Sequence, residues 1–124
     1  MGARKTILVV DDSASVRMLQ EILLRRGPYD VLTASDGAQA LTMAIAHRPD
    51  LILMDVEMPR MNGIQACRAI RSSPQGRNIP IIIVTTHSDK STMDAALKSN
   101  CTDFVHKPID ATELLSKIKS HLGG

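Results

Sequence analysis

Short apolar runs alternate with stretches of helical spacing five times along the 124-residue chain. Three of the runs are almost continuously apolar, which is typical of strands covered by helices on both faces of a sheet. The alternation therefore predicts an α/β fold with a parallel sheet. The five expected strands are Ile7–Val10, Val31–Ala34, Leu51–Met54, Ile81–Val84 and Phe104–His106.

The segments between these runs have the spacing and the end signals of helices. Asp36 followed by Gln39, and Asp110 followed by Glu113, resemble capping boxes, in which two side chains satisfy free backbone N–H groups. Gly27, which is followed by proline, ends the first helix. Apolar residues of that helix repeat at helical spacing, at Val16, Leu19, Ile22 and Leu23.

The connections between parallel strands restrict the order of the sheet, because each crossover should be right-handed. If the first strand is central and the path reverses beside it, the sheet is doubly wound with the order 2-1-3-4-5. Ligands bind beyond the carboxyl ends of the strands at such a reversal, here between the first and third strands. The length suits one compact core, so we expect a single domain over residues 1–124.

Charged and polar side chains gather at that edge of the expected sheet. Asp11 and Asp12 follow the first strand, Asp55 the third and Lys107 the fifth, while Thr85 lies at the end of the fourth. Neighbouring carboxylates repel one another unless a cation neutralises them. Mg²⁺ meets this need, because it takes oxygen ligands and is commonly shared between carboxylates and a phosphate. The four histidines are scattered and do not suggest a zinc site.

A carboxylate beside Mg²⁺ can also attack phosphorus and form an aspartyl phosphate. Asp55 is the best candidate nucleophile, because it stands alone at its strand end whereas Asp11 and Asp12 form a metal-holding pair. Lys107 can neutralise one phosphoryl oxygen, and the Thr85 hydroxyl can donate to another. Each feature alone has a simpler interpretation as a helix cap, a turn or a strand end. Their conjunction at four strand ends favours a phosphoryl site.

Composition narrows the classes of partner. Phe104 and Tyr29 are the only aromatic residues, so a platform of stacked aromatics for nucleic acid is not expected. The net charge is +2 and the basic residues form no block, which gives little support to binding of nucleic acid or an anionic membrane. No apolar run has membrane-spanning length. Two cysteines without CxxC spacing indicate reduced thiols, so we expect a cytoplasmic protein.

Four motifs, in this order and spacing, resemble those of response-regulator receiver domains, of the kind exemplified by the chemotaxis response regulator. They are V-V-D-D (Val9–Asp12), L-M-D-V-E-M-P-R-M-N-G (Leu53–Gly63), V-T-T (Val84–Thr86) and F-V-H-K-P (Phe104–Pro108). The match covers essentially the whole chain. It implies a flavodoxin-like (βα)5 fold and a role in two-component signalling.

The resemblance implies a role for each site residue. Asp55 would accept a phosphoryl group from the phosphohistidine of a sensor histidine kinase or a phosphotransfer protein. Asp12 and Asp55 would bind Mg²⁺ directly, together with the backbone carbonyl of Glu57, and Asp11 would hold a metal-bound water. Lys107 would precede a cis proline bond.

The resemblance also implies a switch and its partners. Thr85 would swing toward the phosphoryl group, and Phe104 would turn inward as it moves. A downstream protein would dock on the surface made by the fourth helix, the fifth strand and the fifth helix, and a phosphorylation-dependent dimer is possible. The chain would be a signalling phosphoacceptor, whose only catalysis is its own phosphorylation and slow dephosphorylation.

Two other functions stay open: a Mg²⁺-dependent phosphohydrolase with an aspartyl nucleophile, and an interaction module that has lost phosphorylation. The first usually needs a D-x-D motif, which the sequence Asp55-Val56-Glu57 breaks. Three residues lie beside the site at positions that vary in the family or depart from its common pattern, namely Glu57, Thr86 and His87. We expect them to tune the lifetime of the phosphoryl group, in a direction that the sequence does not fix.

Overall fold

The computed structural model describes residues 4–86 and 89–123. Within these residues, five strands alternate with five helices. The strands are β1 (Lys5–Val10), β2 (Tyr29–Ala34), β3 (Leu51–Asp55), β4 (Ile81–Thr85) and β5 (Asp103–His106). The helices are α1 (Ala14–Arg25), α2 (Gly37–His47), α3 (Gly63–Ser72), α4 (Lys90–Lys98) and α5 (Ala111–Leu122).

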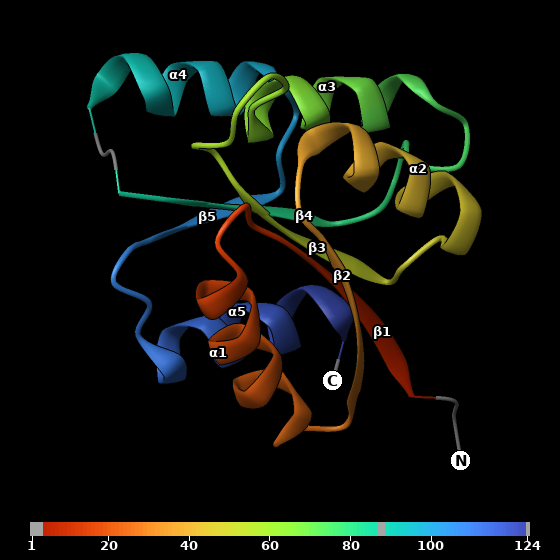
Figure 1. The fold of residues 1–124 in the computed structure, drawn as a ribbon, viewed down its shortest axis with the longest axis vertical. Helices are drawn as coiled ribbons and strands as arrows, with labels where there is room; N and C mark the ends of the chain where they lie inside the picture. The colour runs from red at the N-terminus through yellow and green to blue at the C-terminus, as the bar shows by residue number, and fades with distance from the viewer. Residues whose placement is uncertain (1–3, 87–88, 124) are drawn as a thin grey trace.

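The strands form one parallel sheet in the order β2-β1-β3-β4-β5. Helices α1 and α5 cover one face of this sheet, and α2, α3 and α4 cover the other (Figure 1). This arrangement confirms the predicted doubly wound, flavodoxin-like fold. The path of the chain reverses between β1 and β3, so their carboxyl ends flank the crevice in which such sheets bind ligands.

Each face of the sheet buries its own aliphatic cluster. Ile52, Ile81 and Ile83 pack toward α2, α3 and α4, together with the buried Cys67 of α3. Leu53 and Ile82 are among the strand residues that pack in the second cluster, with residues of α1 and α5. Strands β3 and β4 are buried along their whole length, which explains their continuously apolar sequences.

The strands are longer than the sequence predicted. Strands β1 and β2 each begin two residues earlier than expected, and β5 begins at Asp103. Asp55 and Thr85 are the last residues of β3 and β4 rather than the first residues of the following loops. Strand pairing continues as far as Asp55 because its backbone still pairs with that of Val84.

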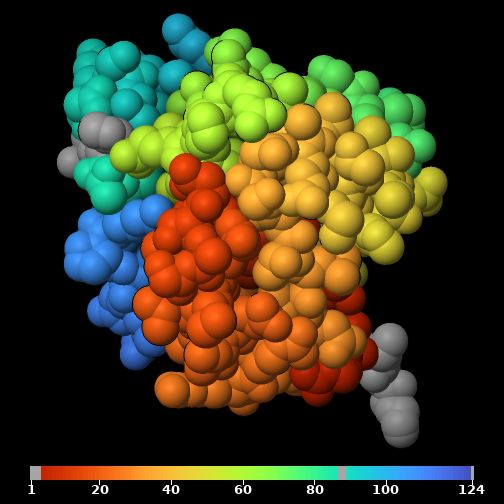
Figure 2. All heavy atoms as spheres, in the orientation of Figure 1, coloured from red at the N-terminus to blue at the C-terminus, as the bar shows by residue number. Residues whose placement is uncertain are grey.

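Helix α1 forms as predicted, but its apolar residues do not all face the core. Leu19 and Ile22 are 68% and 50% exposed, whereas Leu24 and the polar Gln20 are buried. The helix therefore has a second, outward apolar face. Helix α1 itself (red-orange) lies on the side of the molecule that faces the viewer in Figure 2.

The predicted capping residues do cap their helices, although the reciprocal bonds differ from the prediction. Asp36 accepts from the backbone N–H of Gln39, but the Gln39 side chain accepts from Ser35 rather than Asp36. Asp110 accepts from the backbone N–H groups of Thr112 and Glu113. The full capping box lies at the start of α3, between Asn62 and Gln65.

Candidate functional site

Four strand ends meet at one edge of the sheet and bring the predicted site residues together. Val10 pairs with Met54, and Thr85 pairs with His106, so the residues that follow these pairs project from the same edge. Asp11, Asp55 and Thr85 are buried, with 1%, 3% and 1% of their surface exposed, and Asp12 is exposed. The sheet thus positions three polar groups that water scarcely reaches.

Asp11 is held by three neighbouring groups. Its Oδ1 atom accepts a hydrogen bond of 2.9 Å from the backbone N–H of Ser13, and its Oδ2 atom accepts one of 3.2 Å from Nζ of Lys107. The guanidinium of Arg17 donates to its backbone carbonyl at 2.6 Å. Both carboxylate oxygens of Asp11 therefore already accept hydrogen bonds. This suits a residue that orients a metal-bound water better than one that coordinates a metal ion directly. Arg17 was not predicted from the sequence, because no motif marks it.

Lys107 links the two buried aspartates. Its Nζ atom lies 3.0 Å from Oδ1 of Asp55, in addition to its bond to Asp11. The contact with Asp55 is an ion pair without hydrogen-bond geometry, and Oδ1 of Asp55 accepts no hydrogen bond from the described residues. The backbone N–H of Lys107 donates to the carbonyl of Thr85 at 2.8 Å, which fixes the position of the lysine backbone beside β4. The Lys107–Pro108 peptide bond is cis, as predicted.

Burial dominates the electrostatics of Asp55. The pKa of Asp55 is raised from 3.8 to about 6: desolvation is the largest cause, the nearby Asp11 and Glu57 carboxylates add to it, and the Lys107 ammonium offsets part of it. Burial alone would lower the pKa of Lys107, but Asp55 and Asp11 raise it, so the lysine stays charged. The site holds more negative charge than a single lysine neutralises.

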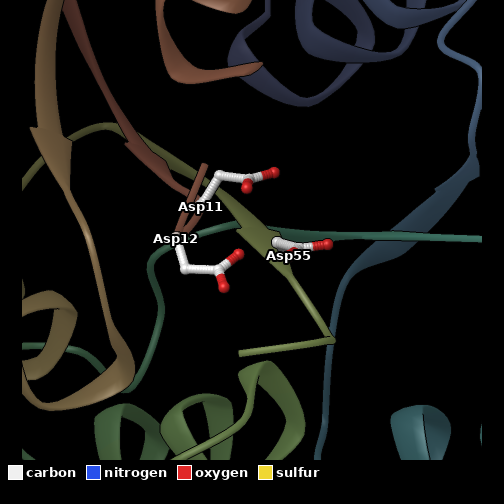
Figure 3. Close-up of side chains that lie close together, drawn as sticks. All are labelled: Asp11, Asp12 and Asp55. Carbon is white, nitrogen blue, oxygen red and sulfur yellow. The ribbon is translucent and has the colours of Figure 1, made fainter. Parts of the chain in front are cut away.

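The three carboxylates form a cluster that can hold a metal ion. One oxygen from each of Asp11, Asp12 and Asp55 lies within 4.8 Å of the others. Figure 3 shows Asp11 and Asp12 just after β1, beside Asp55 at the end of β3. The buried Oδ1 atom of Asp55, which lacks a hydrogen bond from the described residues, is an oxygen that a cation would satisfy. This donor set fits Mg²⁺, which prefers oxygen ligands and keeps some of its water.

A close approach of α3 fixes the backbone of Asp55. A Cβ atom on Gly63 would overlap the carbonyl of Asp55 and lie 2.9 Å from Cγ of Met54. The backbone N–H of Gly63 donates to the carbonyl of Val56 at 3.0 Å. Gly63 therefore lets the start of α3 press against the end of β3, directly behind the candidate nucleophile.

Glu57 bridges the loops after β3 and β4. Its Oε2 atom accepts a hydrogen bond of 2.9 Å from the hydroxyl of Thr86. Its Oε1 atom lies 3.5 Å from both the hydroxyl of Thr85 and the backbone N of Thr86. The sequence placed Glu57 and Thr86 at the rim but did not predict this contact. His87, the third residue expected there, lies outside the described residues.

Phe104 is half-buried and lies on β5, the strand that Lys107 follows. Nζ of Lys117 lies 5.5 Å from the centre of its ring, and the His106 ring meets it edge-on at 5.6 Å. The same Lys117 ammonium donates to the backbone carbonyl of Phe104 at 2.7 Å. Lys117 and His121 also pair with Asp103, whose pKa burial alone would raise but these hydrogen bonds lower.

A groove of about 390 Å³ runs beside the site, between α1 and the segment after β5. Its apolar lining includes Val16, Leu19, Leu23, Pro108 and Ile109. In the space-filling view, the start of α1 (red-orange) adjoins the loop after β3 (yellow-green) (Figure 2). Sequence reasoning missed this groove, because it used the apolar residues of α1 only as a signal of helical spacing.

Comparison with known proteins identifies the family of this chain. The sequence profile of the response regulator receiver domain matches residues 7–119. The chain belongs to the receiver domain family. A curated relative, the response regulator PleD of Caulobacter vibrioides, is 43% identical over 121 residues, which are 97% of this chain and 26% of that protein. The DNA-binding response regulator MtrA of Mycobacterium tuberculosis is 38% identical over 119 residues, or 96% of this chain and 51% of that protein.

Solved receiver structures have the same architecture. The chemotaxis protein CheY4 of Vibrio cholerae is 33% identical, with a TM-score of 0.91 over 97% of this chain and 100% of that one. The receiver domain of the sensor histidine kinase PA1611 of Pseudomonas aeruginosa is also 33% identical, with a TM-score of 0.91 over 98% of this chain and 100% of that one. That structure has a magnesium ion coordinated in its active-site cleft.

The receiver domain described here spans about a quarter to a half of the length of these two curated relatives. Both relatives are named response regulators, and MtrA is named a DNA-binding one. Among the described residues, none of the helices has both the length and the apolar character needed to cross a bilayer.

Proposed function

We propose that Asp55 is the phosphoacceptor of this receiver domain. A sensor histidine kinase or a phosphotransfer protein would donate the phosphoryl group from a phosphohistidine. The observation that carries the proposal is the buried carboxylate of Asp55: its Oδ1 atom lies 3.0 Å from Nζ of Lys107, and one of its oxygens lies within 4.8 Å of carboxylate oxygens of Asp11 and Asp12. Burying a carboxylate that is incompletely satisfied is costly, and a carboxyl group whose pKa is raised by burial and by nearby charges is a candidate functional group.

In the proposed reaction, a carboxylate oxygen of Asp55 attacks phosphorus, and the P–N bond of the phosphohistidine breaks as the new P–O bond forms. The bonding electron pair leaves with the imidazole nitrogen, which is protonated. Lys107, already 3.0 Å from Asp55, neutralises charge on a phosphoryl oxygen. Thr85 supplies its hydroxyl to another oxygen. The burial of Asp55 and Thr85 keeps bulk water away from the acyl phosphate.

Mg²⁺ would be held by Asp12, Asp55 and the backbone carbonyl of Glu57, with Asp11 orienting a bound water, and it would neutralise charge that develops during transfer. Asp11 suits the water-holding role because Ser13 and Lys107 already engage both of its oxygens. The related PA1611 receiver, which binds magnesium in its cleft, supports this assignment.

The response to phosphorylation would be a shift of population. The added phosphoryl oxygens attract the Thr85 hydroxyl, and Phe104 turns inward into the space that Thr85 leaves. This would change the surface of α4, β5 and α5, on which a downstream protein docks or a second copy dimerises. We further propose that residues 1–124 act as one cytoplasmic signalling domain, without direct contacts to nucleic acid or membrane.

A labelling experiment tests the site. The protein is incubated with a small acyl phosphate and Mg²⁺, and the added phosphoryl group is detected by intact-protein mass spectrometry. We expect labelling of the native protein and of Asp94→Asn, a matched control on the exposed surface of α4, and none of Asp55→Asn. Chelation of Mg²⁺ should abolish labelling of the native protein.

The same samples separate the alternatives. Equal labelling of native protein and Asp55→Asn would refute the assignment of the site. Rapid turnover of a generic phosphomonoester would instead favour a phosphohydrolase. A folded protein that no phosphodonor labels would favour a phosphorylation-independent interaction module.

A further inference from the structure

The Glu57 carboxylate lies where two hydrogen-bond donors converge. The hydroxyl of Thr85 and the backbone N–H of Thr86 both point at its Oε1 atom, each at 3.5 Å. A hydroxyl and an amide that converge on one oxygen form the kind of donor pair that binds an anion. Thr85 is buried, so water hardly competes for its hydroxyl as a hydrogen-bond donor.

A second contact anchors this carboxylate. The Thr86 hydroxyl donates to the other oxygen, Oε2, at 2.9 Å, which is the shortest of the three bonds. Glu57 is exposed, and a free glutamate side chain would lose rotamer entropy on adopting one position. The anchoring bond to Thr86 offsets this loss and holds the negative charge over the loop after β4. An alanine or glycine at position 86 would lack the hydroxyl.

The position of Glu57 also bears on Asp55. Glu57 follows Asp55 by two residues, and its charge is one of the causes that raise the pKa of Asp55. A phosphoryl group on Asp55 would bring further negative charge to the same rim. It could reach the hydroxyl of Thr85 only if the carboxylate of Glu57 withdrew.

We propose that Glu57 is a resident anion of the unphosphorylated domain: its carboxylate occupies the Thr85 and Thr86 donors that a phosphoryl group on Asp55 needs, and Thr86 holds it there. This inference rests on the proposed phosphoacceptor role of Asp55. Glu57 is thus a positioning residue that restrains phosphorylation. Phosphorylation must displace it, and the displaced carboxylate then repels the new phosphoryl oxygens.

The decisive variant is Glu57→Gln, which keeps the size of the side chain and its bond to the Thr86 hydroxyl but removes the charge. We expect the rate of labelling by a small acyl phosphate at saturating Mg²⁺ to rise by about fivefold, because like charges a few ångström apart repel even in a solvent-like environment. Thr86→Val, which removes the anchoring hydroxyl, should also accelerate labelling. The double variant should gain little more, because both changes release the same contact.

Glu113→Gln is the matched control, because it removes the same charge from an exposed position in the first turn of α5. Its labelling rate should equal that of the native protein. A second readout needs neither metal nor phosphate: in the free protein, the backbone amide resonance of Thr86 should move on Glu57→Gln and not on Glu113→Gln. The Mg²⁺ affinity of each variant is measured separately, so that saturation is assured.

One outcome would overturn the resident-anion proposal and leave Asp55 as the acceptor: the native protein is labelled, but Glu57→Gln and Thr86→Val are labelled no faster. An unmoved Thr86 amide would overturn it as well. Failure to label any of the five proteins, the native one included, would instead overturn the proposed function, on which this inference depends.

Discussion

Asp55→Asn should stabilise the protein by about 2 kcal/mol at pH 7 when no divalent cation is present. Asp55 is 3% exposed, and burial raises its pKa from 3.8 to about 6. The native fold thus disfavours the carboxylate form that predominates at pH 7, and asparagine removes this cost while keeping the shape of the side chain. The measurement is urea unfolding of both proteins in a metal-chelating buffer.

The expected pH dependence has a definite sign. Below the unfolded pKa of 3.8, Asp55 is protonated in both states and costs nothing. As the pH rises toward about 6, the unfolded chain releases the proton while the folded protein retains it, so the native protein loses stability. Above about pH 6 the whole cost is present. The advantage of Asp55→Asn should therefore be complete at pH 8, roughly half as large at about pH 5, and nearly absent below about pH 4.

Magnesium should act in the opposite direction and favour the native protein. A cation that binds the folded carboxylates stabilises the native protein by mass action, and Asp55→Asn lacks one of the three carboxylates. We therefore expect Mg²⁺ to raise the stability of the native protein more than that of the variant. An Asp55→Asn variant that is less stable than the native protein at pH 8 without metal would contradict this account of the site.

The second large effect is a loss of stability of about 3 kcal/mol on Gly63→Ala. The added Cβ atom would overlap the carbonyl of Asp55 and press on Met54, so either α3 or the end of β3 must move. Backbone atoms at the end of a buried strand cannot yield as a flexible side chain does. Urea unfolding measures the loss, and Mg²⁺ affinity should fall in the fraction that folds, because Asp55 shifts.

Gly27→Ala is the control for this substitution. Its Cβ atom would lie 3.1 Å from the edge of the Tyr29 ring, a side chain that can rotate slightly, rather than against backbone. We expect a cost of less than about 1 kcal/mol there. Equal losses in the two variants would mean that α3 withdraws from Asp55 easily, and that the close approach does not hold the site.

The sequence predicted the fold because its strongest signals are local. The burial of β3 and β4 requires continuous apolar runs, and those runs are visible without coordinates. The position of Asp55 at the end of one such run then places it at the carboxyl edge of the sheet, where Lys107 also arrives. The strand order needed a further assumption, that the first strand is central and that the path reverses beside it, because the handedness of the connections only restricts the order.

Features that depend on side-chain conformation could not be predicted in this way. The rotation of α1 about its axis is set by packing, so the pattern alone did not indicate that Leu24 is buried while Leu19 is exposed. The bond from Arg17 to the carbonyl of Asp11 joins a side chain to backbone, and no residue pattern marks such a contact. Likewise, the Glu57–Thr86 bond joins two loops whose separation is known only once the sheet is assembled.

The environment of Phe104 makes the molecule well suited to optical measurement. The chain contains no tryptophan, so Phe104→Trp would introduce a single indole at the half-buried position beside His106 and Lys117. Both neighbours can quench indole emission, and an inward turn would carry the ring away from them. One fluorophore could then follow activation in real time, without a label or a partner.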